Sequence, residues 1–237
     1  MNKLNRSAGS KRQILVQPTT IVQHNSLGTW DVFLSLFGSL IGTLHTDIVL
    51  LQDPPSSKGF LPRFAGFKSF SPPSLKPKMA CYVSLDFSAR YAILARFYDN
   101  TPDTMFLYIY TPGSCFGTPA STFRIGNVYA PECSNHARTV PPEIAFQQLD
   151  SLYLVAGDSN IHNPATNPSW VFSYSDELSS APFHNLASDL RFKHLNAPVV
   201  YTRFPLSGSH RQGVIDLAFS NPQMSPAFST WDALAHP

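Results

Sequence analysis

Several features that mark specialised protein classes are missing from this sequence of 237 residues. Its three cysteines, Cys81, Cys115 and Cys133, form no CxxC pair, which excludes a disulfide framework and suits a reducing compartment. Charged residues make up 14% of the chain, against about 25% in an average protein. The net charge of +2 is too small to indicate a nucleic-acid partner by itself.

Long hydrophobic runs are also absent. The most apolar window, residues 32–41, is roughly half as long as a membrane-spanning helix must be. The apolar residues that follow the basic start are too few for a signal peptide. We therefore expect no membrane association and an intracellular location, nuclear or cytoplasmic.

A hydrophobic share of 43% and many aromatic residues nevertheless predict a folded chain with a sizeable core. Residues 1–12 carry four basic side chains and are expected to form a flexible start. Neither a repeat nor a low-complexity tract divides the remainder, so residues 13–237 are predicted to form one domain.

The hydrophobic pattern predicts a mixture of strands and helices. Strands are expected at residues 21–24, 47–51, 79–85, 91–96, 105–110, 123–129, 152–156, 199–204 and 214–219. Helices are expected at residues 30–44, 141–151 and 186–195, and a proline-rich loop at residues 53–79. This order favours sheets covered by helices over a regular alternation of strand and helix.

Polar residues end several of these strands, where open α/β sheets build their sites. Each alone has a structural explanation, such as a turn or a helix cap for Asn25, Asp53 or the GDxN segment. Together their carboxylate and amide oxygens suit a hard ion such as Mg²⁺ rather than zinc. Metal-assisted phosphodiester hydrolysis would follow from such a set. The set is Asn25, Asp53, Asn127, Tyr129, Asp158, Asn160 and Asp216.

The order of these motifs resembles the endonuclease/exonuclease/phosphatase superfamily, and within it the endonuclease domains of LINE-type (non-LTR) retrotransposons and their fungal relatives. The matching stretches lie in one order along the chain, at residues 22–25, 47–55, 127–131, 155–162, 201–203 and 214–217, with Pro164 and Trp170. The resemblance implies an α/β fold of two packed mixed β-sheets flanked by helices, a four-layer sandwich.

The resemblance also implies a role for each site residue. Asn25 and Asp53 correspond to the metal-side pair, with Mg²⁺ as the cofactor and Mn²⁺ as a substitute. Tyr129 corresponds to a tyrosine that contacts the scissile phosphate. Asp158 and Asn160 correspond to the residues that activate water and stabilise the transition state. Asp216 corresponds to the carboxylate that orients a catalytic histidine.

Two departures from the family pattern affect these expectations. The family usually has Glu where this chain has Asp53, so the shorter side chain must reach the ion by a closer backbone, through water, or not at all. The family's terminal Ser-Asp-His signature is absent, and the Ala-His-Pro setting of His236 does not match it. We therefore expect the domain to lack its last strand, which would leave one sheet edge unpaired.

DNA is the expected partner, with Lys76, Lys78, His162 and Arg203 assigned to nucleic-acid binding. Lys76 and Lys78 lie in the proline-rich loop, where basic and phenylalanine side chains alternate. The alternative for that loop is a packed surface segment whose phenylalanines dock on the core. A retroelement origin would add a reverse transcriptase encoded downstream, and we expect a monomer.

The main hypothesis is a Mg²⁺-dependent endonuclease that nicks DNA. A second keeps the fold and changes the substrate, giving an abasic-site nuclease, a deadenylase or a phosphatase. A third is a decayed or truncated retroelement fragment, catalytically impaired and with at most weak nucleic-acid binding. Asp53 and the missing histidine favour the third, whereas the series of motifs favours the first.

Overall fold

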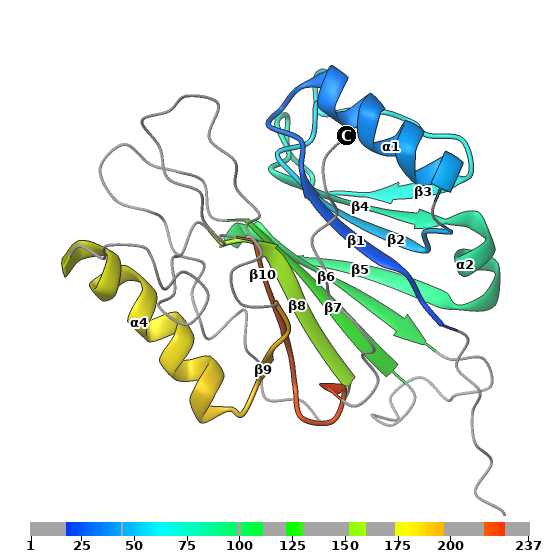
Figure 1. Cartoon of the computed structure of the whole chain (residues 1–237). Coiled ribbons are helices and arrows are strands. Elements are labelled where there is room, and N and C mark those ends of the chain that lie inside the picture. The colour runs from blue at the N-terminus through cyan, green and yellow to red at the C-terminus, as the bar shows by residue number, and fades with distance from the viewer. Residues whose placement is uncertain are drawn as a thin grey trace, which may run out of the picture.

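Two β-sheets pack face to face, and helices cover their outer faces (Figure 1). The computed structural model describes residues 18–43, 45–98, 101–110, 122–129, 152–159, 174–196 and 216–225. Helix α1 (Trp30–Thr43) lies outside one sheet and α4 (Tyr174–Asp189) outside the other. The four-layer α/β sandwich predicted from the motifs is confirmed.

The first sheet has four strands in the order β1-β2-β4-β3. The parallel pair β1 and β2 is joined through α1, because parallel neighbours need a crossover connection between them. Apolar residues recur along one face of α1, so Phe33 and Phe37 pack against Leu51 and Tyr82. The strands are β1 (Ile21–Asn25), β2 (Ile48–Gln52), β3 (Phe67–Phe70) and β4 (Met79–Ser84).

The second sheet has six strands in the order β5-β6-β7-β8-β10-β9. Its outer face is covered by α4 through the buried side chains of Phe183 and Ala187. The strands are β5 (Ala92–Tyr98), β6 (Thr101–Tyr110), β7 (Thr122–Tyr129), β8 (Leu152–Asp158), β9 (Lys193–His194) and β10 (Asp216–Ser220).

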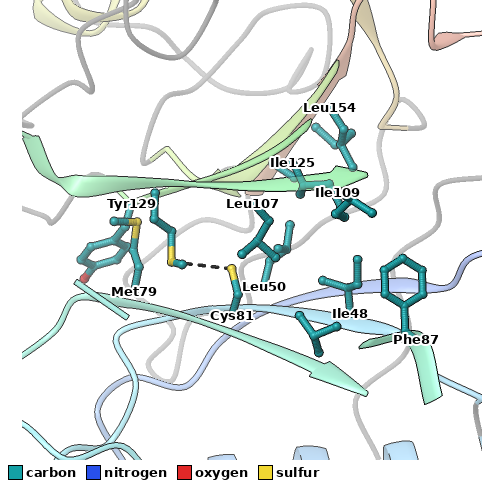
Figure 2. Close-up of a cluster of buried hydrophobic side chains, with 14 of the residues drawn as sticks. Ile48, Leu50, Met79, Cys81, Phe87, Leu107, Ile109, Ile125, Tyr129 and Leu154 are labelled. Atoms are coloured by element: carbon teal, nitrogen blue, oxygen red, sulfur yellow. Dashed lines mark hydrogen bonds between the residues drawn. The ribbon is translucent and has the colours of Figure 1, made fainter. Parts of the chain in front are cut away.

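The main core lies between the sheets, because alternate residues of each strand face inward. Leu50 of β2, Cys81 of β4 and Leu107 of β6 belong to this fully buried cluster (Figure 2). Burial raises the pKa of the Cys81 thiol to about 12, so this cysteine stays protonated and unreactive. Tyr129 and Met79 lie beside one another at one end of the cluster, and Phe87 lies at the other.

The predicted strands that fall in the described residues, and the helix after β1, are found with shifted ends, but the loop at residues 53–79 is only partly a loop. It contains β3, which pairs with β4 from Phe67↔Ser84 to Phe70↔Cys81. A short helix, α2 (Leu85–Arg90), begins where a strand was expected to end, because the Ser84 hydroxyl accepts a hydrogen bond from the Phe87 amide as an N-cap.

The helix predicted at residues 186–195 is wrong at both ends. Helix α4 begins at Tyr174 and ends at Asp189. Arg191 adopts a left-handed conformation (φ 58°), and the Phe192 and Arg191 amides bond back to Ala187 and Ser188, which is a Schellman ending. Lys193 and His194 then form β9, which pairs with β10 at one edge of the second sheet.

Some expectations fall outside the described residues: the basic start at residues 1–12, the helix at 141–151 and the strand at 199–204. Among the described residues, no helix is long and apolar enough to cross a membrane.

Candidate active site

Polar residues from both sheets meet at one end of the inter-sheet core. In the first sheet, Asn25, Gln52 and Met79 are neighbours across β1, β2 and β4. In the second, Tyr129, Asp158 and Asp216 are neighbours across β7, β8 and β10. The strand ends therefore form two facing rows, and the structure brings the backbones of five predicted site residues, Asn25, Asp53, Tyr129, Asp158 and Asp216, to these rows.

A hydrogen bond between Asn25 and Asp158 joins the two rows. Asn25 Nδ2 donates to Asp158 Oδ2 over 2.6 Å, although the two residues are 133 positions apart. The Leu27 amide donates to Asn25 Oδ1 over 2.9 Å, so the Asn25 side chain is held at both of its polar atoms. Asp158 is only 3% exposed. The opposite sheet therefore helps to orient this buried carboxylate.

Asp53 follows β2 directly and is fixed by its backbone. Its amide donates to the Lys78 carbonyl over 2.8 Å, and its carbonyl accepts bonds from the Gly28 amide and the Ser26 hydroxyl, both over 2.7 Å. Its φ of 41° is left-handed, a conformation that Asp tolerates better than most residues. The loop after β1 and the start of β4 thus hold Asp53 between them.

The Asp53 carboxylate has one occupied and one available oxygen. Lys78 Nζ lies 2.9 Å from Oδ1. No residue in the described part of the chain donates a hydrogen bond to Oδ2. Asp53 Oδ2 can therefore accept a further hydrogen bond or bind a cation.

Lys78 also approaches Tyr129. Its ammonium lies 6.0 Å from the centre of the Tyr129 ring. Tyr129 is buried and lies beside Met79 in space (Figure 2). Met79 is the residue that follows Lys78 in the sequence. Lys78, which the sequence assigned to a DNA-binding loop, therefore belongs to the same polar end as Asp53 and Tyr129.

Gln52 and Asn127 form a second hydrogen-bonded connection between the sheets. Both side chains are fully buried. Gln52 Nε2 donates to Asn127 Oδ1 over 2.5 Å, and Asn127 Nδ2 donates to the Ala80 carbonyl over 3.0 Å. Sequence reasoning placed Asn127 in the set of polar strand-end residues without a role of its own, and gave Gln52 no role. The sequence feature that could have identified both residues is an amide side chain in an otherwise apolar strand. A buried amide must find a hydrogen-bond partner.

The donor atoms of this end suit a hard divalent cation. Asp53 offers Oδ2, and Asn25 Oδ1 keeps one of its two lone pairs beyond the bond from Leu27. Among the described residues, no three His, Cys, Asp or Glu side chains cluster closely enough to hold a metal alone. Mg²⁺ typically takes one or two carboxylates and fills its other positions with water and phosphate oxygen, so the set fits.

The structure describes the other predicted residues to different extents. Asn160, His162 and Arg203 lie outside the described residues, and for Asp216 only the backbone is described. Lys76 is exposed near the polar end of β4. Their assigned roles remain predictions.

The phenylalanines of the proline-rich loop mostly dock on the core. The rings of Phe64 and Phe67 lie 4.3 Å and 5.6 Å from the ring of Phe37 in α1. Lys68 lies over the ring of Phe70, which packs against the main core. Phe60 is the exception, being 77% exposed. The packed-loop alternative is therefore favoured over base stacking for this segment.

Comparison with known proteins gives matches by structure only. No family model matches the sequence, and no curated protein matches it significantly. The structure is similar to the endonuclease domain of TRAS1, a telomere-specific non-LTR retrotransposon, with a TM-score of 0.62 and 17% identity over 88% of each chain. It is also similar to the AP endonuclease LMAP from Leishmania major (TM-score 0.65, 9% identity, 88% of this chain and 80% of that one).

A third similar structure is the 3′-5′ exonuclease NExo from Neisseria meningitidis, with a TM-score of 0.58 and 16% identity over 89% of this chain and 90% of that one. At such identities the likeness concerns the fold. The chain thus has the fold of the endonuclease/exonuclease/phosphatase superfamily, as the order of its motifs predicted.

Proposed function

We propose that this protein hydrolyses phosphodiester bonds in DNA with the help of Mg²⁺, or Mn²⁺ in its place, and that it nicks DNA as retrotransposon endonucleases do. The observation that carries the proposal is the Asn25–Asp158 hydrogen bond of 2.6 Å. It places a buried carboxylate from one sheet against an amide from the other, at the strand ends that Asp53 directly follows. The fold is that of nucleases, which supports the same reaction class.

Asp158 is the proposed general base. With Oδ2 engaged by Asn25, the carboxylate is held in one orientation and can accept a proton from a water molecule. That water then attacks phosphorus, and one P–O bond breaks. Asn160 and Tyr129 are proposed to donate hydrogen bonds to the phosphate oxygens, whose negative charge grows in the transition state.

Asp53 and Asn25 are the proposed metal-side residues. A bound Mg²⁺ would neutralise phosphate charge and lower the cost of the developing oxyanion. The shorter reach of Asp53, compared with the family's Glu, is balanced by a backbone that three hydrogen bonds fix next to β1 and β4.

DNA would approach the same end of the sandwich. Lys76, which is exposed next to the site, is proposed to contact the DNA backbone, together with His162 and Arg203. The similarity to the TRAS1 endonuclease supports a retroelement origin, which implies a reverse transcriptase encoded downstream and access to nuclear DNA. We propose a monomeric domain.

A plasmid assay tests this function. The full chain is incubated with supercoiled plasmid in Mg²⁺ or in chelator, beside Asp158→Asn and a matched control, Asp189→Asn. Asp189 is an exposed carboxylate at the end of α4. We expect nicking that requires Mg²⁺, falls at least ~100-fold in Asp158→Asn and persists in Asp189→Asn. Equal nicking by all three proteins, or none by the wild type, would contradict the proposal.

The same assay separates the related activities. An AP endonuclease and a 3′-5′ exonuclease have similar structures, so abasic duplex and 3′-recessed duplex are the comparison substrates. Faster cleavage of either than of intact plasmid would replace DNA nicking by that activity, while the roles of Asp158 and Asp53 would stay the same.

A further inference from the structure

The ion pair between Lys78 and Asp53 occupies the place where the metal-side carboxylate should meet its cation. Lys78 Nζ lies 2.9 Å from Asp53 Oδ1, and the two side chains are 44% and 27% exposed. A pair this exposed contributes little to stability. Its significance lies in its position, because the positive charge stands at the carboxylate that the proposed reaction needs.

The backbone makes this pairing a built feature of the fold. β2 and β4 are antiparallel with Gln52 opposite Met79, so the next residues outward, Asp53 and Lys78, continue the same ladder. The Asp53 amide completes it by donating to the Lys78 carbonyl over 2.8 Å. A lysine at this register therefore begins from a backbone position directly across from Asp53, within reach of its carboxylate.

The surroundings of Lys78 keep its ammonium at the reaction end. It approaches the face of Tyr129, a ring assigned to the scissile phosphate, at 6.0 Å. The lysine side chain is a compact charge on a flexible four-carbon stem, and nearly half of it faces solvent. It can therefore exchange Asp53 for a nearby phosphate by rotating its own bonds.

We propose that Lys78 is the resident cation of this site: it neutralises Asp53 in the free protein, opposes divalent metal there, and transfers its ammonium to the substrate phosphate when DNA binds. The inference rests on the proposed function, since it concerns the same carboxylate. Metal and phosphate then bind cooperatively, and by linkage each raises the affinity for the other by the same factor.

This exchange gives the site a specific order of assembly. A single positive charge within a few ångströms of a divalent ion repels it strongly at a partly dry surface. Free metal is thus held weakly until a phosphate draws Lys78 away from Asp53. The protein would bind metal firmly only on DNA, so Lys78 determines when the site is loaded.

The test measures Mn²⁺ binding by electron paramagnetic resonance, without nucleic acid, on the full chain. Lys78→Met removes the charge and keeps all but the last atom of the side chain's length. Lys193→Met is the control, because it removes the same charge from an exposed position on β9 at the far side of the second sheet. We expect Lys78→Met to bind Mn²⁺ about tenfold more tightly than the wild type and Lys193→Met to bind like the wild type.

Two additions locate the effect. The gain should disappear in the double variant Asp53→Asn/Lys78→Met, because the freed carboxylate is then absent. A thymidine dinucleotide, which supplies one phosphodiester, should tighten Mn²⁺ binding by the wild type and by Lys193→Met by a larger factor than it does by Lys78→Met. Thermal melting checks that each variant folds, and Lys78→Gln replaces Lys78→Met if the latter does not.

Equal Mn²⁺ affinity of Lys78→Met and wild type, or a gain that survives Asp53→Asn, would overturn the proposal. Such a result leaves metal-dependent nicking by the wild type intact, so failure here is distinct from failure of the proposed function.

Discussion

Asn127 lies fully buried between the sheets. Its side chain accepts a hydrogen bond from Gln52 and donates one to the Ala80 carbonyl. Asn127→Ala would leave the buried Gln52 Nε2 without its hydrogen bond to Asn127, at a cost of about 1–3 kcal/mol in the free energy of unfolding. Urea unfolding would measure it. Asn185→Ala, at an exposed position of α4, is the matched control and should change stability by less than ~0.5 kcal/mol. Equal effects would show that the buried bridge does not stabilise the fold.

Asp47 is a second buried polar residue with a structural role, at the opposite end of β2. It is fully buried, accepts a bond from the Thr20 amide over 3.0 Å and pairs with Arg90 over 2.8 Å. Asp47→Ala would leave the Arg90 guanidinium without its carboxylate, so we expect a loss of about 3 kcal/mol in unfolding free energy. The exposed Asp86→Ala serves as control, and a similar loss there would argue against the account.

At the scale of single residues, sequence reasoning identified Asn25 and Asp158 because each is polar and directly ends an apolar strand. It could not identify their hydrogen bond, which depends on how two separate sheets face each other. It also placed Lys78 on a DNA-binding loop. The position of Lys78 next to Asp53 follows from the β2–β4 register, and no local pattern in the proline-rich segment encodes that register.

The contact between β7 and β8 is tight enough to require glycine at the position before Asp158. A Cβ at Gly157 would stand 1.8 Å from the Val128 carbonyl oxygen, which no packed structure tolerates. Gly157→Ala should therefore separate these strands and cost about 3 kcal/mol or more, and it should also displace Asp158.

A matched glycine provides the control for this prediction. Gly38 lies in α1, and a Cβ there would meet no atom within 4 Å. Gly38→Ala should stabilise the protein by up to ~1 kcal/mol, because alanine favours helix. Thermal melting of both variants checks the pair, and a stable Gly157→Ala protein would contradict the described strand contact.

Two histidines make the packing of α4 on the second sheet sensitive to acid. The rings of His184 in α4 and His194 in β9 both lie against the ring of Phe219 in β10. Burial lowers the pKa of His184 to about 4, with the neighbouring His194 adding to the effect. Burial also lowers the pKa of His194 to about 4. Both side chains are therefore neutral in the folded protein at neutral pH.

The sign of the pH dependence follows directly. Below the unfolded pKa of 6.5, the unfolded chain binds protons that the folded protein does not, so the free energy of unfolding falls as pH falls toward 4. Between about pH 7.5 and about pH 5.5 we expect a loss of about 2–3 kcal/mol in urea unfolding. His184→Gln/His194→Gln should flatten this profile, whereas His45→Gln, at an exposed position, should not. An unchanged profile in the double variant would refute the assignment.

At the scale of elements, long apolar or alternating segments were predictable, including α1, β2 and β8. The short ones were not. β3 has only four residues, partly exposed, and becomes a strand because β4 provides an edge for it. The end of α4 depends on Arg191 in a left-handed conformation, where sequence reasoning looks for glycine.

Across the whole molecule, the two sheets are held in one arrangement by an apolar core and by amide bridges near one end of it. This arrangement explains why residues far apart in the sequence form one site. It also explains why the overall fold was predictable: the order of the motifs is tied to the order of strands in the sandwich, whereas side-chain contacts depend on the packing of the sheets.

The most direct test of the account is whether Asn25 and Asp158 act as one unit in catalysis. The rate of plasmid nicking in Mg²⁺ is measured for Asn25→Ala, Asp158→Asn and the double variant. Because Asn25 orients Asp158 in addition to its proposed role at the metal, we expect the rate loss of the double variant to be clearly smaller than the product of the two single losses. Rate losses that multiply would mean that the two residues act independently, and would contradict a site built by contact between the sheets.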